Sequence, residues 1–244
     1  MRTFSYFFSI LIIATSCKQD YKIEGSATII GLEGKKLFLR TLQKDKWIDI
    51  DSTDIVHCEF KMKGKVDSTI MAFLFLDHQQ IMPIVLEKGN VVVTIDNKDI
   101  SAQGTLLNNT LYEFIRIKNN LEFEYEELNR NRMKRMMESS SIKEAHNQYM
   151  EQAYDLERKM QRLTDSFIQQ NYENVLGPNL FMASYGNTNY PLLTPEIKNI
   201  MDKAPEAFKN DSQVKCFISK ARENTHRIKS ESNPKSMEHN TIFH

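Results

Sequence analysis

The feature that most restricts the fold is a change in hydrophobic period at Gly104-Thr105. From Tyr21 up to this point, apolar residues alternate with polar ones or form short runs between turn signals, and β-branched and aromatic residues are common, as in strands. Beyond it, apolar residues recur every three or four positions, which is the period of a helix. The sequence therefore predicts an α+β fold in which a β-rich domain precedes a helical one.

In the first half we expect strands near 21–31, 35–42, 46–52, 55–63, 69–77, 80–87, 90–96 and 99–103. Strands at such regular spacing favour an antiparallel β-sandwich or a barrel-like domain. The clearest alternation puts Val56, Cys58, Phe60 and Met62 on one apolar face of a strand. On that face Cys58 is most simply a small core residue.

Two helical stripes follow. The first is Leu107, Leu111, Phe114, Lys118, Leu121, Tyr125 and Leu128, and the second is Ile142, Ala145, Tyr149, Ala153, Leu156, Met160, Leu163 and Phe167. Ser139-Ser140-Ser141 ends the first helix, and Ser141 with Glu144 has the pattern of a capping box at the start of the second. We expect a long antiparallel helical hairpin, part of which projects because each helix reaches roughly 40–50 Å.

Turn and cap residues predict how the helical half continues. Gly177-Pro178 is expected to end the second long helix, and Thr194-Pro195 has the cap and proline typical of a helix start. Shorter helices are expected near 179–186, 195–203 and 211–227. Past Lys229 the chain is polar and without period, which indicates a disordered tail.

The first residues have the outline of an export signal. After Met1-Arg2 come about ten mostly apolar residues, too few for a spanning helix, which needs roughly 20. The next residues, Ala14, Thr15, Ser16 and Cys17, resemble the lipobox of bacterial lipoproteins. That resemblance implies recognition of Ala14, Thr15 and Ser16 by the signal peptidase, cleavage before Cys17 and lipid on its thiol. An ordinary secretory signal with an incidental cysteine is the alternative.

The predicted location and the division of the chain follow. By resemblance to lipoprotein sorting, Lys18 after the cysteine favours a lipid-anchored protein of the outer membrane, on its periplasmic face or at the cell surface. The chain divides into a signal peptide at 1–16, a lipidated tether at 17–20, a β-rich domain at 21–104, a helical domain at 105–229 and a disordered tail at 230–244.

Charge excludes one class of partner. The chain has 32 basic and 32 acidic residues, and cleavage removes Arg2 and no acid. The mature chain is then nearly neutral and lacks the basic footprint of a nucleic-acid binder.

Several segments resemble a bacterial family with an N-terminal domain of unknown function (DUF4369-like). The segments are 21–25, 34–39, 50–53, 60–64, 83–89 and 104–108. In that family the domain follows a lipobox and commonly precedes a thioredoxin-like domain of the thiol-disulfide interchange or peroxiredoxin type. His57-Cys58 stands where the family usually has a turn glycine. The thioredoxin-like domain is absent from this sequence, so its redox activity is not carried over.

The sequence offers few candidates for chemistry. It has no Cys-x-x-Cys motif, and its histidines lack the spacing of metal ligands, so we expect no catalytic residues, no metal site and no cofactor. A bridge between Cys58 and Cys216 stays open. Trp47, Asp49 and Asp51 share a predicted strand face and form a candidate ligand or partner surface for a sugar or a cation. The favoured alternative is that Trp47 packs under a neighbouring element, such as the helical hairpin.

The hairpin carries the other candidate surface. Acidic residues are followed by Arg130, Arg132, Lys134 and Arg135 near Met133, Met136 and Met137. This is either a solvated face or a partner surface at a projecting tip.

We therefore expect a non-enzymatic envelope lipoprotein that acts as a binding or interaction module. One alternative is an accessory to a separate thioredoxin-like thiol-disulfide oxidoreductase, which rests on family architecture alone. Another is a truncated member of that family without activity.

Overall fold

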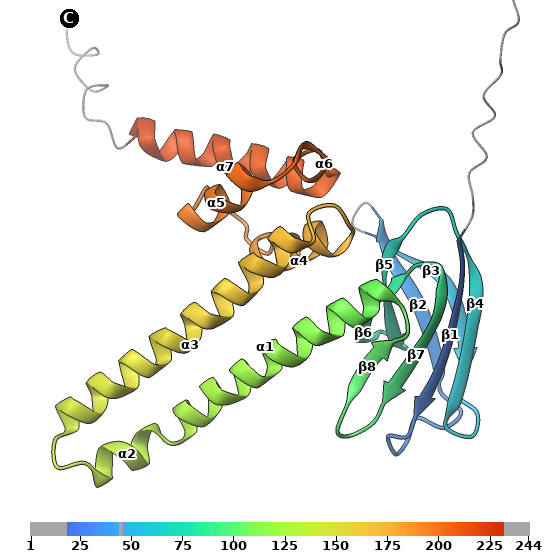
Figure 1. Ribbon diagram of the computed structural model, residues 1–244, viewed down its shortest axis with the longest axis horizontal. Helices are drawn as coiled ribbons and strands as arrows, with labels where there is room; N and C mark the ends of the chain where they lie inside the picture. Colours follow the sequence, from blue (N-terminus) through green and yellow to red (C-terminus); the bar gives the residue numbers. More distant parts are fainter. Residues whose placement is uncertain (1–18, 44–45, 232–244) are drawn as a thin grey trace, which may run out of the picture.

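The computed structural model describes residues 19–43 and 46–231. The predicted lipidation site Cys17, with Ala14, Thr15 and Ser16 before it, lies outside the described residues, as do residues 232–244 of the expected tail. The described part has a β-rich half followed by a helical half, which confirms the predicted α+β class (Figure 1).

Two four-stranded sheets make up the β-rich half. The strands are β1 (Gln19–Ala27), β2 (Lys36–Gln43), β3 (Lys46–Asp54), β4 (Glu59–Val66), β5 (Ile70–Leu76), β6 (Gln79–Leu86), β7 (Gly89–Ile95) and β8 (Ile100–Gln103). The sheets have the orders β4-β1-β7-β8 and β3-β2-β5-β6. β1 and β7 run parallel, and the remaining neighbours run antiparallel. The sheets form an open sandwich and not a closed barrel.

Alternation along the strands supplies the sandwich core. Residues from both sheets become fully buried between them, among them Ile23, Leu37, Leu74 and Val91. Along β1, β2 and β7 the side chains between the buried positions are exposed or half-buried, as the period of two requires, whereas Ile84, Val85 and Leu86 of β6 are all buried.

The connection from β3 to β4 differs from the prediction. Val56 and Cys58 do not lie on the apolar face of a strand but are exposed, and β4 begins only at Glu59. Val56 and Glu59 pair across a two-residue turn in which His57 and Cys58 both have positive φ, 54° and 61°. Apolar alternation continues through this turn, so the period alone could not reveal it. Cys58 is thus not a core residue.

A carboxylate holds that turn. The backbone N–H groups of His57 and Cys58 donate to the two oxygens of Glu33, at 2.8 and 2.9 Å. The hydrogen bonds from Cys58 and His57 hold the pKa of Glu33 below its ordinary value, because they favour the ionised form. Glu33 therefore supports the turn at neutral pH, and that support is lost as the pH falls through its lowered pKa.

The helical half contains a long hairpin and a terminal cluster of helices. Its helices are α1 (Leu106–Arg130), α2 (Arg132–Glu138), α3 (Ile142–Gln170), α4 (Leu176–Tyr185), α5 (Pro195–Lys203), α6 (Glu206–Lys209) and α7 (Ser212–Glu231). We call α1, α2 and α3 the arm. Ser141 accepts from the backbone N–H of Glu144 and Thr194 from that of Ile197, as their cap patterns predicted.

The arm projects away from the sandwich, and α2 forms its tip (Figure 1). At the base, Phe114 of α1 packs on Phe167 of α3 with ring centroids 4.3 Å apart, and both rings join the sandwich core. The distal half has a separate small cluster built on Leu128, Ala153 and Leu156. The predicted stripes therefore face each other, and only Ile142 at the far end is strongly exposed.

The second long helix does not end at Gly177-Pro178. It ends at Gln170, and both residues lie in the first turn of α4, where a proline removes no helical hydrogen bond. A Cβ atom at position 177 would lie 2.3 Å from the carbonyl oxygen of Asn171, so the glycine serves the close approach of the two helix ends.

The terminal helices have a core of their own. Phe181 of α4 is fully buried and meets the rings of Phe208 and Phe217 edge-on, at 5.7 and 5.6 Å. Tyr172 donates to the carbonyl oxygen of Ile200 at 2.6 Å, and burial raises the pKa of its hydroxyl to about 12. α7 continues to Glu231, so Ser230, the first residue of the expected tail, is helical.

One buried amide joins the two halves of the molecule. The side chain of Asn108, in the first turn of α1, accepts from the backbone N–H of Val85 at 2.9 Å and donates to its carbonyl oxygen at 2.8 Å. It also donates to Thr105 Oγ1, and Asn108 is 0% exposed. β6 is the last strand of its sheet, so Asn108 provides at Val85 the hydrogen bonds that a further strand would make.

We predict that Asn108→Ala lowers the free energy of unfolding by about 2–4 kcal/mol, because it leaves a buried N–H and a buried C=O of Val85 without partners. Urea unfolding of the mature chain measures this. Asn119→Ala, at an exposed position of the same helix, is the matched control, with an expected change of less than about 0.5 kcal/mol. Equal effects of the two substitutions would contradict the role of Asn108.

We also predict that Cys58→Gly raises the free energy of unfolding by about 0.5–1 kcal/mol, because glycine adopts positive φ without strain. Cys58→Ala is the control, since alanine keeps the Cβ atom and the strain. Thermal unfolding compares them, and an alanine variant as stable as the glycine variant would refute this explanation.

Candidate functional site

The first candidate surface surrounds Trp47, which is 43% exposed. Its ring meets Phe73 and Phe75 of β5 edge-on, with centroids 5.4 and 4.9 Å apart. Trp47 thus packs against other strands of its own sheet, in keeping with the favoured expectation of packing, although the element is β5 and not the helical hairpin given as an example.

The structure separates the two aspartates. A register shift between Leu39 and Arg40 places Asp49 opposite Arg40 and Asp51 opposite the buried Leu39. Asp51 Oδ1 accepts from the backbone N–H of Ser52 at 2.8 Å. Residues directly opposite each other in a sheet share a face, so Asp51 lies on the inner side with Leu39. Burial raises the pKa of Tyr21, and the negative charge of Asp51 raises it further. Asp49 and Asp51 therefore do not form a pair of carboxylates on one face.

Arg40 occupies the middle of this surface. Its guanidinium lies over the rings of Phe38 and Phe75, at 4.6 and 4.9 Å. Its Nε donates to Asp49 Oδ1 at 2.6 Å and a terminal nitrogen donates to the carbonyl oxygen of Asp77 at 2.8 Å. The polar groups here already bind one another, so the cluster is explained by packing within the sheet. A ligand at Trp47, Asp49 and Asp51 stays a prediction.

The second candidate surface is the distal half of the arm, and here large apolar side chains are exposed on both helices and on the tip. They are Phe123, Met133, Met137, Ile142, Met150 and Tyr154. Met137 is 78% exposed, although it lies in a helix whose other residues are mostly charged. Exposed apolar groups gathered on one projecting element are typical of a protein-binding surface.

Hydrogen bonds hold the two distal helices together. Tyr149 donates to Asn129 at 2.6 Å and Tyr125 donates to Glu157 at 3.1 Å, both between α1 and α3.

Elsewhere on the arm the same helices leave a cleft of about 410 Å³. It is lined by Phe123, Glu124, Glu127, Leu128, Asn131, Arg135, Gln152, Asp155, Leu156 and Lys159.

Basic residues surround the exposed methionines, as the sequence indicated. Arg132 lies over the ring of Tyr149 at 4.7 Å, and Arg135 donates to Gln152 at 3.0 Å. Arg130 pairs with Glu127 of the preceding turn. The tip is thus an apolar patch with a mainly cationic rim, whose side chains are partly fixed by contacts within the arm.

The structure does not bring the two cysteines together as a disulfide. Cys58 and Cys216 are both exposed and unpaired. In residues 19–43 and 46–231, no three histidine, cysteine, aspartate or glutamate side chains lie together as they would around a metal ion. Within the same residues, no helix has the length and apolar character needed to span a bilayer.

A polar network between α3 and α4 was not predicted. Tyr185 donates to Asp165 at 2.6 Å, and Gln161 donates to both. Burial and the neighbouring Asp165 raise the pKa of Tyr185, so it stays a neutral donor. The network joins α3 to α4 and has a structural role.

The comparisons with known proteins concern the β-rich half. The family model described as "Domain of unknown function (DUF4369)" matches residues 21–111. Neither the search of curated proteins nor the search of solved structures gave a match. The matched segment ends at Leu111 and thus includes Asn108, which closes the edge of β6. The sandwich and the first turns of α1 are accordingly similar to this domain family, as the sequence resemblance predicted.

Proposed function

We propose that the protein is a non-catalytic interaction module, anchored to the envelope membrane by lipid on Cys17, whose arm presents its tip to a partner protein. The observation that carries the proposal is the set of exposed apolar side chains on the distal arm. A helical hairpin needs one apolar face to hold its two helices together, and the tip methionines are not part of that face.

The chemistry of the tip indicates the kind of partner. Methionine side chains are flexible and polarisable and adapt to varied apolar surfaces. The rim of arginines and lysines favours a partner whose apolar patch is bordered by acidic residues, because complementary charge fixes orientation and speeds association. The alternative role as an accessory, which rests on family architecture alone, names a thioredoxin-like protein as the partner, and its recovery would support that role.

We predict that Met133→Gln with Met137→Gln reduces recovery of the partner about tenfold, because glutamine keeps length and helix propensity but removes apolar contact. The measurement is crosslinking in native membranes followed by purification of the tagged chain. Ile30→Gln, at a 96% exposed position in the β1–β2 loop, is the control. Undiminished recovery with the double variant would exclude the tip as the binding surface.

The anchor has its own test. Cells supplied with a clickable fatty acid should label the wild-type protein and not Cys17→Ser, and the serine variant should leave the membrane fraction. Absence of label on the wild type would end the anchoring proposal and leave the arm proposal to be judged separately.

A further inference from the structure

We infer that the exposed face of α7 is a membrane-contact surface that binds anionic phospholipid headgroups. The inference deepens the proposed function, since it rests on an anchor at Cys17. The inference also specifies how the protein is oriented on the membrane, because contact between α7 and the bilayer directs the arm away from the bilayer.

The position of β1 supplies the first step. Two peptide steps separate Cys17 from Gln19, the first residue of β1, so lipid on Cys17 would hold that strand end within about 7 Å of the anchored residue. β1 and β7 are parallel, so the turn after β7, which contains Lys98, lies at the opposite end of the sandwich. The end of the sandwich that faces the membrane is therefore the one opposite Lys98.

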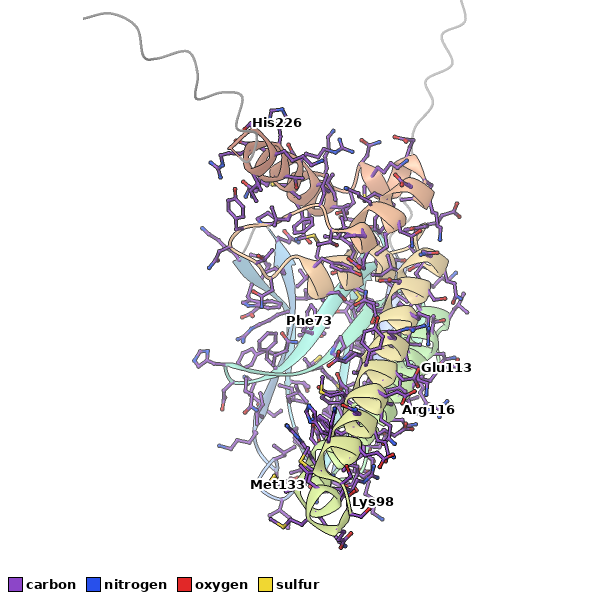
Figure 2. The ribbon with its side chains drawn as sticks, turned by 90° about the vertical axis from the view of Figure 1, so that its left-hand side faces the viewer. Phe73, Lys98, Glu113, Arg116, Met133 and His226 are labelled. Carbon is purple, nitrogen blue, oxygen red and sulfur yellow. The ribbon has the colours of Figure 1, made fainter. Side chains whose placement is uncertain are left out.

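The terminal helices lie at that membrane-facing end. Figure 2 shows Lys98 and the tip residue Met133 at one end of the molecule and His226 of α7 at the other. In Figure 1, α7 lies crosswise to the strands, beyond the end at which β1 begins. The start of β1 and α7 are thus on the same side, and the tip of the arm is on the far side.

The side chains of α7 sort into a buried row and an outward face that is bordered by basic residues. Val214, Phe217, Ile218 and Ala221 are buried in the terminal core. That core includes residues of α4 and α5, which Figure 1 places between α7 and the arm. The opposite face of α7 consequently looks outward, away from the rest of the molecule.

Basic residues border the outward face of α7 on both of its sides. Lys215, Lys220, Arg222, Arg227 and Lys229 are all exposed. Lys215, Arg222 and Lys229 are seven residues apart and form a row along one side of the outward face, and Lys220 and Arg227 form a row along the other side. Glu223 lies between the two rows. The acids of α7 are Glu223 and its last residue, Glu231. Because the whole chain has equal numbers of basic and acidic residues, this is a local concentration of charge, suited to an anionic lipid surface.

Three of these residues can be changed without disturbing the fold. Lys215, Lys220 and Arg222 make no side-chain hydrogen bond or ion pair with another residue of the described part of the chain. Arg227 is left in place because it donates to Tyr190. Arg116, Lys143 and Arg162 are exposed basic residues on the arm outside α2 and serve as the matched control.

The experiment uses mature residues 17–244 carrying Cys17→Ser, so that no lipid contributes. We expect the protein to float with vesicles containing phosphatidylglycerol, not with phosphatidylcholine alone, and to be released by salt. Lys215→Glu/Lys220→Glu/Arg222→Glu should lower the bound fraction roughly tenfold or more, whereas the arm triple should bind as the parent does. Thermal unfolding checks that each variant is folded.

The outcomes separate this inference from the anchor. No binding of the parent to anionic vesicles, or equal losses in both triples, would overturn the inference and leave fatty acylation of Cys17 untouched. A second measurement locates the contact: in a Cys58→Ser background, a fluorophore on Cys216 of α7 should be quenched by headgroup-labelled lipid. A fluorophore at Met137→Cys, with Cys216→Ser, should not be. Stronger quenching at the tip would contradict the orientation.

Discussion

The joint between the sandwich and the arm depends on one amide. β6 is an edge strand, and an edge strand needs partners for its free N–H and C=O groups wherever another element covers it. Asn108 supplies both partners to Val85 and is itself fully satisfied by Thr105. Tyr112, one turn further, donates to the carbonyl oxygen of Pro83 at 2.8 Å. These bonds fix the direction in which α1 leaves the sandwich, and with it the position of the tip.

The arm packs into a large apolar core at its base and has only a small apolar cluster at its end. Phe114 and Phe167 belong to the large core that the sandwich provides, whereas Leu128, Ala153 and Leu156 form a small cluster between two helices alone. Local opening is easiest where few apolar contacts would be lost. The distal arm therefore opens more easily than its base, which would let it adapt to the proposed partner.

Strands and long helices could be predicted because burial follows their period, and single turns could not. The pattern of Val56, Cys58, Phe60 and Met62 runs straight through a two-residue turn whose residues lack the expected glycine. The separation of Asp49 from Asp51 comes from a register shift against β2, which no local pattern records. The basic residues of α7 are visible in the sequence. That they lie on the same side of the molecule as the start of β1 follows only from how the terminal helices pack.

The claim that the arm presents its tip to a partner protein is tested most directly by photo-crosslinking in producing cells. A photoreactive amino acid is placed at position 137 on the tip or at position 30 in the β1–β2 loop, and the membranes are irradiated. We expect a discrete crosslinked product at position 137 that is absent at position 30. No product at 137, or the same products at both positions, would contradict it.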